Sequence, residues 1–256
     1  MKWRLMLVPP RSGAENMARD SGLLDRARET GESVFSVYSW ERPTLSFGRN
    51  QTAAGKYDLA AIESRGLDVV RRPTGGRALL HNREVTYSVT APISPGESLN
   101  ASYERINSLL LDALFSIGVQ ARVAAASTPP LPPGEIPCFA EPSRGELVNE
   151  GRKLVGSAQV REDGALLQHG SILIEDDQSL IGKVSLTPPP TDAAPAATLS
   201  AALGRAPEIE EVADALFAAV MWSEDAGARR LKESDVSAFT ARHIDRYRSE
   251  WWTWRR

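Results

Sequence analysis

The residues of this sequence that could carry covalent chemistry are a single cysteine, Cys138, and a lysine fifteen positions later, Lys153. A thiol with no second cysteine cannot form an internal disulfide, so a functional Cys138 would act as a nucleophile. A nearby ammonium group lowers the pKa of a thiol and makes it reactive at neutral pH. A lone cysteine is otherwise a small buried apolar residue. However, Pro137, Pro142 and Gly145 predict a loop here, which favours the nucleophile.

A second candidate segment, RRPTGGRALLHNREVTYSV, spans 71–89. Gly75 and Gly76 lack Cβ atoms where the chain leaves a predicted strand, which would let a ligand lie against the backbone. Arg72 and Arg77 flank the pair and could bind an anion or a carbonyl group. His81 could donate a hydrogen bond to a ligand, or it could be a structural residue paired with a neighbouring backbone group.

The third candidate segment, 151–174, combines small residues with a histidine. We expect Asp163 and Gly164 to form a hairpin turn, which would place Ser157 roughly opposite His169 on the facing strand. Burying Lys153 on this hairpin would be costly without a function, whereas a solvated Lys153 would be an ordinary surface residue. The small and polar candidates of this segment are Gly156, Ser157, Ala158, Gln168, His169 and Gly170.

Composition excludes several classes of protein. Of 256 residues, 42% are apolar, which is enough for a substantial core, and one cysteine fits a reducing cytosol. The three histidines lie far apart, so we expect no metal site, and the net charge of −3 argues against nucleic acid as a partner. No apolar run is long enough for a membrane span or a signal peptide, so we expect a cytoplasmic protein that does not bind membranes. Basic residues gather in the candidate segments, which would suit an acidic substrate or partner: Arg49, Arg71, Arg72, Arg77, Arg152, Lys153 and Arg161.

Hydrophobic periodicity predicts an α+β fold of mostly antiparallel strands in mixed sheets flanked by helices. Helices are predicted over 15–29, over 56–66 and after a cap at Asn100, where apolar residues recur at helical spacing up to Gly118. A turn at 41–43 separates two short strands. The predicted strands cover 1–8, 33–40, 44–49, 67–72, 84–92, 119–123, 146–151, 153–162 and 165–175.

The composition changes after Leu186. Residues 187–207 are rich in proline and alanine, which predicts a linker between a core over 1–186 and a helical tail over 208–256. Within the tail, an apolar stripe from Ile209 to Val220 and a segment over 235–247 predict helices.

Three motifs in order, RRPTGGRALLHNREVTYS, GRKLVGSAQVR and LQHGSIL, resemble the family of lipoate-protein ligases, biotin-protein ligases and octanoyltransferases. NMARD and LSFGRNQ fit the same pattern, and the resemblance covers residues 3–185. TGGRA stands where ATP-dependent lipoate ligases typically read SGGGAV. PCFAEPS resembles the cysteine segment of octanoyl-[acyl carrier protein]:protein octanoyltransferases.

The resemblance implies the catalytic-domain fold of this family in 1–186 and a ping-pong acyl transfer without metal or ATP. Cys138 would take octanoyl from acyl carrier protein as a thioester, with Lys153 as the second catalytic residue. A lysine of a lipoyl domain would then accept the acyl group; glycine-cleavage H protein and the E2 subunit of 2-oxoacid dehydrogenases are such partners. The implied substrate-binding residues are Arg72, Thr74, Gly75, Gly76, Arg77 and His81, together with those of the hairpin.

Three other functions are compatible with parts of this pattern. An ATP-dependent lipoate-protein ligase would need Mg²⁺ and ATP, and would not need Cys138. An amidotransferase would use the same cysteine to move octanoyl between lipoyl-domain proteins. A non-catalytic lipoyl-domain binding protein would have no use for both Cys138 and Lys153.

Overall fold

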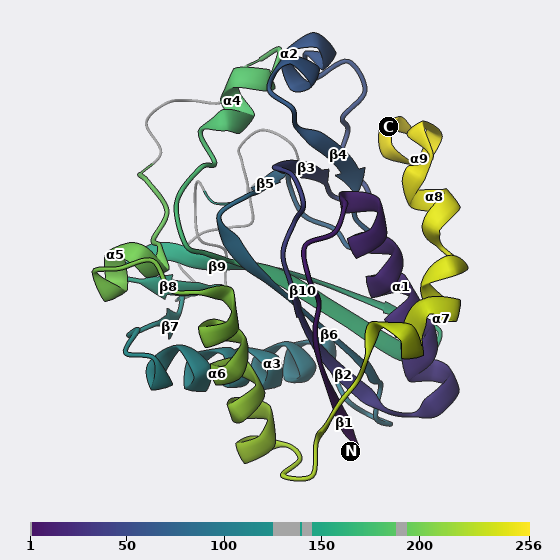
Figure 1. The fold of residues 1–256 in the computed structure, drawn as a ribbon, viewed down its shortest axis with the longest axis vertical. Coiled ribbons are helices and arrows are strands. Elements are labelled where there is room, and N and C mark those ends of the chain that lie inside the picture. The colour runs from purple at the N-terminus through teal and green to yellow at the C-terminus, as the bar shows by residue number, and fades with distance from the viewer. Residues whose placement is uncertain (1, 125–138, 140–144, 188–193) are drawn as a thin grey trace.

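The computed structural model describes residues 2–124, 139, 145–187 and 194–256. Cys138 lies outside the described residues. The fold is α+β, with two mixed sheets flanked by helices, as predicted (Figure 1).

The larger sheet has eight strands among the described residues. Its strands pair in the order β11-β1-β2-β6-β10-β9-β8-β7, with parallel pairing of β1 to β11 and to β2 and antiparallel pairing elsewhere. The bounds are β1 (Trp3–Leu7), β2 (Ser33–Tyr38), β6 (Glu84–Pro92), β7 (Arg122–Val123), β8 (Leu147–Asn149), β9 (Arg152–Glu162), β10 (Ala165–Leu173) and β11 (Arg229–Arg230).

A smaller sheet has the order β4-β3-β5, formed by β3 (Thr44–Phe47), β4 (Asp68–Arg71) and β5 (Leu79–His81). β3 pairs parallel with β4 and antiparallel with β5. The turn predicted at 41–43 therefore carries the chain from one sheet to the other, since β2 and β3 do not pair with each other.

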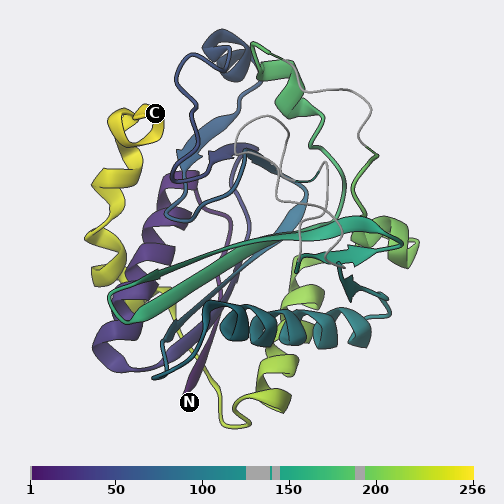
Figure 2. The same ribbon diagram turned by 180° about the vertical axis from the view of Figure 1, so that it is seen from behind.

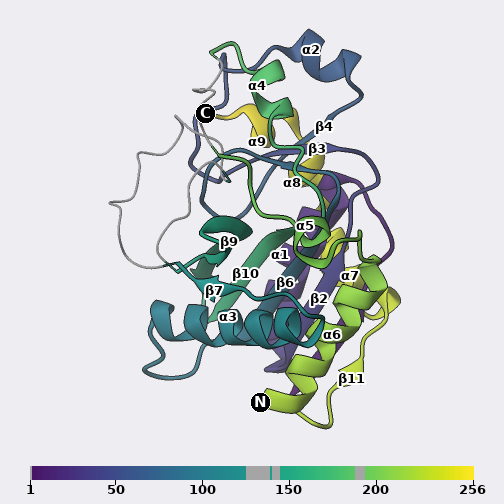
Figure 3. The same ribbon diagram turned by 90° about the vertical axis from the view of Figure 1, so that its left-hand side faces the viewer.

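Helices cover both faces of the larger sheet (Figures 2 and 3). Alternation along β2 points Phe35 and Val37 into the core under α3 and α6, and Val34 and Tyr38 toward α1. All six residues of β2 are buried for this reason. The bounds are α1 (Gly13–Thr30), α2 (Leu59–Ser64), α3 (Leu99–Ser116), α4 (Leu180–Val184), α5 (Leu199–Leu203), α6 (Ile209–Ser223), α7 (Ser237–Ala241), α8 (Ile244–Arg248) and α9 (Glu250–Trp254).

Local sequence explains where the two longest helices begin. Ser12 and Glu15 form a capping box at α1. At α3 the cap is Ser98, whose hydroxyl accepts a hydrogen bond from the backbone N–H of Ala101, so the prediction of Asn100 as cap was wrong by two residues.

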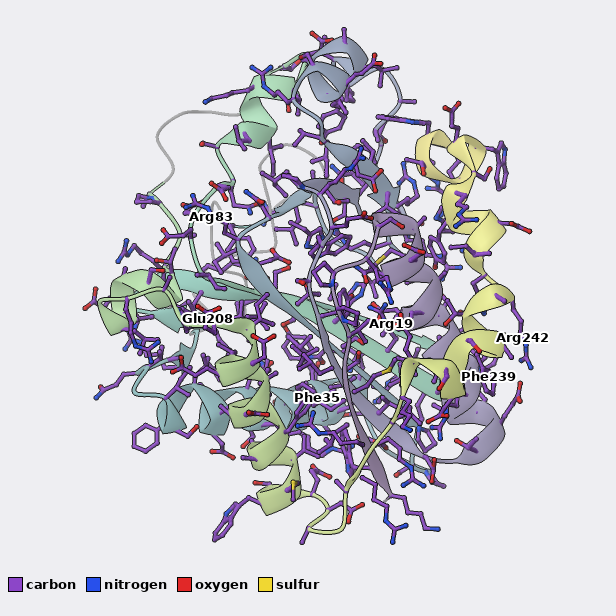
Figure 4. The ribbon with its side chains drawn as sticks, viewed as in Figure 1. Arg19, Phe35, Arg83, Glu208, Phe239 and Arg242 are labelled. Atoms are coloured by element: carbon purple, nitrogen blue, oxygen red, sulfur yellow. The ribbon has the colours of Figure 1, made fainter. Side chains whose placement is uncertain are left out.

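The C-terminal residues share the core of the rest of the chain. Helix α6 buries Leu216 and Phe217 in the same cluster as Phe35, which Figure 4 places near the centre of the molecule. Helix α7 packs closely on α1 because Gly22 has no Cβ; an added Cβ would lie 2.8 Å from the backbone of Phe239. The predicted segment over 235–247 is divided among a 3₁₀ turn (Glu233–Val236), α7 and α8.

The described part of the predicted linker also packs against the core. Leu199 is fully buried, and the N–H of Ala197 donates to the carbonyl of Lys153 at 2.9 Å. The boundaries at 186 and 207 stay a prediction. None of the described helices combines the length and apolarity needed to cross a membrane.

Candidate active site

A cavity of about 430 Å³ opens between the Gly-rich loop 72–77, the β9–β10 hairpin and the first turn of α3. Its volume suits a small organic ligand. Its lining brings together ten of the residues predicted from the sequence, namely Arg72, Gly75, Gly76, Arg77, His81, Gly156, Ser157, Ala158, His169 and Gly170.

Two predicted binding residues, Thr74 and Gln168, lie behind the wall instead. Both are fully buried. The hydroxyl of Thr74 lies 2.6 Å from Nε2 of His169, and the Gln168 amide donates to the Tyr87 hydroxyl at 3.0 Å. They support lining residues and do not face the cavity.

Backbone contacts shape the Gly-rich loop. The Arg72 guanidinium donates to the carbonyls of Gly75 and Arg77, at 3.2 and 2.9 Å. Gly76 has φ 97°, in the region that favours glycine. Gly48 allows β3 to approach, since a Cβ there would lie 2.0 Å from the carbonyl oxygen of Gly76. Backbone conformation therefore explains the glycine at position 76, and close backbone packing explains the glycine at position 48.

The β9–β10 hairpin forms another wall. Its turn is at Asp163 and Gly164, both with positive φ, as predicted. Ser157 pairs with Gly170, however, and His169 with Ala158, so the predicted pairing was wrong by one residue. Pattern alone does not set register to one residue, although a one-residue shift turns each side chain to the other face.

A tyrosine fixes the serine of this wall. The Tyr87 hydroxyl lies 2.7 Å from Oγ of Ser157. Burial raises the pKa of Tyr87 to about 12, although hydrogen bonds to Gln168 and Ser157 oppose the shift, so the phenol stays protonated and can donate.

Lys153 is buried beside the cavity and paired with a carboxylate. Its Nζ lies 2.7 Å from Oε1 of Glu146, a cavity-lining residue, and 4.9 Å from the centre of the Phe139 ring. A buried ammonium needs such a partner. Glu146 was missed in the sequence, where it is one acidic residue among many. Phe139 directly follows Cys138 in the chain.

Both histidines of the site are held by carboxylates that the sequence analysis also missed. His169 Nδ1 lies 2.8 Å from Oδ2 of Asp20, and His81 Nδ1 lies 2.7 Å from Oε1 of Glu84. Burial lowers the pKa of His81, although Glu84 opposes the shift, so His81 is neutral at pH 7. His81 is thus paired with side chains, and its ring also stacks on Trp40 at 3.9 Å.

The basic residues expected around the site are dispersed. Of the seven, only Arg72 and Arg77 line the cavity. Arg71 is fully buried and donates to the carbonyls of Gly48, Gln51 and Thr253, and burial lowers its pKa to about 10. Arg161 binds the carbonyls of residues 97 and 98 before α3. The charges that cluster in the sequence therefore do not form a continuous basic rim.

The described residues include no group of three or more histidine, cysteine, aspartate or glutamate side chains placed to hold a metal ion.

Comparisons with known proteins place this chain among lipoyl protein ligases and octanoyltransferases. The lipoyl protein ligase A/B catalytic domain family matches residues 12–221. Octanoyltransferase LipM of Kyrpidia tusciae is 44% identical over 185 residues, which are 68% of this chain and 67% of that protein. Octanoyltransferase LipM of Symbiobacterium thermophilum is 38% identical over 231 residues, 84% of each chain.

Solved structures share the fold. A lipoate protein ligase from T. acidophilum with bound lipoic acid has a TM-score of 0.80 at 19% identity, covering 99% of this chain and 100% of that one. Lipoate-protein ligase A bound with ATP has a TM-score of 0.82 at 20% identity, covering 99% of each. The family resemblance and the fold expected from the motifs are confirmed, and the chain belongs to the lipoyl protein ligase A/B catalytic domain family.

Proposed function

We propose that this protein is an octanoyltransferase of lipoate biosynthesis, which moves octanoyl from acyl carrier protein to a lysine of a lipoyl domain through a thioester on Cys138. Relatives named octanoyltransferase LipM at 38–44% identity support the activity. The observation that carries the mechanism is the buried ammonium of Lys153 beside the cavity, in contact with Phe139.

The first half-reaction exchanges one thioester for another. The Cys138 thiol gives its proton to solvent, the thiolate attacks the octanoyl carbonyl carbon, the bond to the carrier sulfur breaks, and the carrier thiolate leaves and takes up a proton from solvent. Donor and product are both thioesters, so the step needs no ATP. A neighbouring ammonium lowers the pKa of the attacking thiol and stabilises the developing oxyanion, which is the role we assign to Lys153.

The second half-reaction forms an amide. The neutral amine of the acceptor lysine attacks the thioester carbon, the bond to the Cys138 sulfur breaks, and the proton that the nitrogen loses passes to the released thiolate or to solvent. The oxyanion again needs donors. Ser157 and Gly76 line the same cavity, so the hydroxyl of Ser157 and the backbone N–H groups near Gly76 are our candidates besides Lys153.

The cavity would hold the acyl chain. An octanoyl group has six methylenes, and burying each contributes about 0.8 kcal/mol, or about 5 kcal/mol together. Gly75, where an added Cβ would meet no atom of the described residues within 4 Å, lets that chain approach the backbone, and Met17, Leu79 and Leu99 supply apolar surface. We propose that residues 1–186 carry this chemistry and that no metal or ATP takes part.

Acyl-donor substitution tests the proposal. Purified protein and a lipoyl domain are incubated with octanoyl-acyl carrier protein, with octanoate plus ATP and Mg²⁺, or with an octanoylated second lipoyl protein. Intact mass of the acceptor then reports transfer. We expect the acceptor to gain octanoyl from the carrier without ATP. Transfer only with octanoate and ATP would indicate a ligase, and transfer only from the octanoylated lipoyl protein would indicate an amidotransferase. No transfer from any donor would indicate a binding protein. Each of these three results would overturn the proposal.

A further inference from the structure

Asp20, a buried carboxylate on α1, begins a chain of hydrogen-bonding side chains that ends at the Gly-rich loop. Its Oδ2 lies 2.8 Å from Nδ1 of His169, and Nε2 of the same ring lies 2.6 Å from Oγ1 of Thr74. Each of these three residues is at most 4% exposed. The chain thus connects α1, β10 and residue 74 through the interior.

Glu84, on β6, begins a second chain that reaches the same loop from the other side. Its Oε1 lies 2.7 Å from Nδ1 of His81, and Nε2 of that ring lies 2.7 Å from Oγ of Ser46. The Arg72 guanidinium donates to Ser46 Oγ and also to the carbonyls of Gly75 and Arg77. The loop is therefore held at Thr74 by one chain and around Gly75 by the other.

The chemistry of the side chains determines which atom donates in each hydrogen bond of the two series. An ionised carboxylate only accepts hydrogen bonds, so Nδ1 of each histidine must carry the proton and donate it. In a neutral imidazole, Nε2 is then an acceptor, and the hydroxyl of Thr74 or Ser46 donates to it. The carboxylate sets the tautomer, and the tautomer orients the hydroxyl.

We propose that Asp20 and Glu84 are positioning residues, which act through His169 and His81 to hold the loop 72–77 as one wall of the cavity. The glycines of the loop offer no side-chain anchors of their own, and Gly76 has φ 97°. Thr74 does not line the cavity, so its hydroxyl acts through the loop and not on the ligand. The kinetic part of this inference rests on the proposed octanoyl transfer.

The three histidines of the chain allow a direct test by nitrogen-15 NMR of the free protein. We expect Nδ1 of both His81 and His169 to carry a proton, because each faces a carboxylate oxygen. His243 is an internal reference, because the ring nitrogen that faces a carboxylate there is Nε2, which lies 2.7 Å from Oδ2 of Asp25. We therefore expect the proton that points at the carboxylate to be on Nε2 in His243 and on Nδ1 in the other two histidines. An Nδ1 without a proton in His169 or His81 would overturn the corresponding chain.

Isosteric variants test the positioning role. Thr74→Val removes the hydroxyl, and Thr74→Ser keeps it. Thr90→Val is the matched control: Thr90 is fully buried on β6, and its hydroxyl has no hydrogen-bond partner among the residues that the structure describes. We expect Thr74→Val to speed hydrogen exchange at the amides of Gly75 and Gly76 and to lower kcat about 10- to 100-fold with KM within threefold.

Thr74→Ser should recover most of the lost kcat and protection, and Thr90→Val should resemble the parent protein. Folded Thr74→Val protein with unchanged amide exchange and unchanged kcat would overturn the inference. Exchange and tautomers are measured without substrate. If they behave as expected while no octanoyl is transferred by any variant, the proposed function fails and the two hydrogen-bonded chains stand.

Discussion

Adding one methyl group should lower stability at Gly76 but not at Gly75. A Cβ on Gly76 would lie 3.2 Å from the Arg72 guanidinium, and its φ of 97° is unfavourable for alanine. We expect Gly76→Ala to lower the free energy of unfolding by about 1–2 kcal/mol, since left-handed backbone costs about that much for a residue with a Cβ. For a chain of this size, the melting temperature should fall by about 2–8 °C.

Gly75 differs from its neighbour although both line the cavity. Its φ is not positive, and an added Cβ would meet no described atom within 4 Å. Gly75→Ala should therefore leave the free energy of unfolding unchanged or raise it by about 0.4–1 kcal/mol, because alanine restricts the unfolded chain. Equal losses of stability in the two variants, measured by urea unfolding, would refute the loop conformation.

Gly75→Ala also probes the acyl site without disturbing the fold. The added methyl takes cavity volume comparable to one methylene, which contributes about 0.8 kcal/mol when buried, or about a fourfold change in rate. We expect the preference for octanoyl over hexanoyl, measured as the ratio of kcat/KM values, to fall about fourfold. An unchanged ratio in the folded variant would place the acyl chain away from this loop.

Two further predictions concern charge. Lys153→Ala should slow alkylation of Cys138 by iodoacetamide at neutral pH, because the pKa of the thiol rises when a nearby cation is lost. Lys183→Ala, at an exposed lysine, is the control. Equal alkylation rates in the two variants would mean that Lys153 acts only in stabilising the oxyanion or in placing the substrate. Hydrogen bonding to Arg4 lowers the pKa of Glu32 to about 2, so the stabilisation that ionised Glu32 contributes is complete above about pH 5 and is lost as pH falls toward 2. Glu32→Gln should reduce the loss of unfolding free energy on acidification between those values, and an unchanged acid profile would contradict this.

Local signals in the sequence were sufficient for the fold class and for much of the cavity. The hairpin turn at Asp163 and Gly164, and the small residues of the β9–β10 strands, are visible in single segments of ten to twenty residues. Together with the segment 71–89, these strands hold most of the cavity lining, because the site is built from strands and turns whose residue types are locally constrained.

The partners of the site could not be predicted in the same way. Asp20 meets His169 across 149 positions of sequence, and an aspartate within an amphipathic helix has no local feature that marks it as buried. Glu146 is likewise an ordinary charge until β8 and β9 bring it to Lys153. The apolar stripe of α6 indicated a buried face but not its partner, so its packing against Phe35 was unforeseen.

The central claim is that Cys138 carries octanoyl as a thioester. Its most direct test is the intact mass of the enzyme after incubation with octanoyl-acyl carrier protein alone, followed by peptide mapping and hydroxylamine treatment. The account predicts a gain of one octanoyl group on the peptide that contains Cys138, released by hydroxylamine and absent in the folded, nearly isosteric Cys138→Ser variant. Full octanoyl transfer to a lipoyl domain by Cys138→Ser, or a wild-type enzyme that transfers without ever forming this adduct, would contradict it.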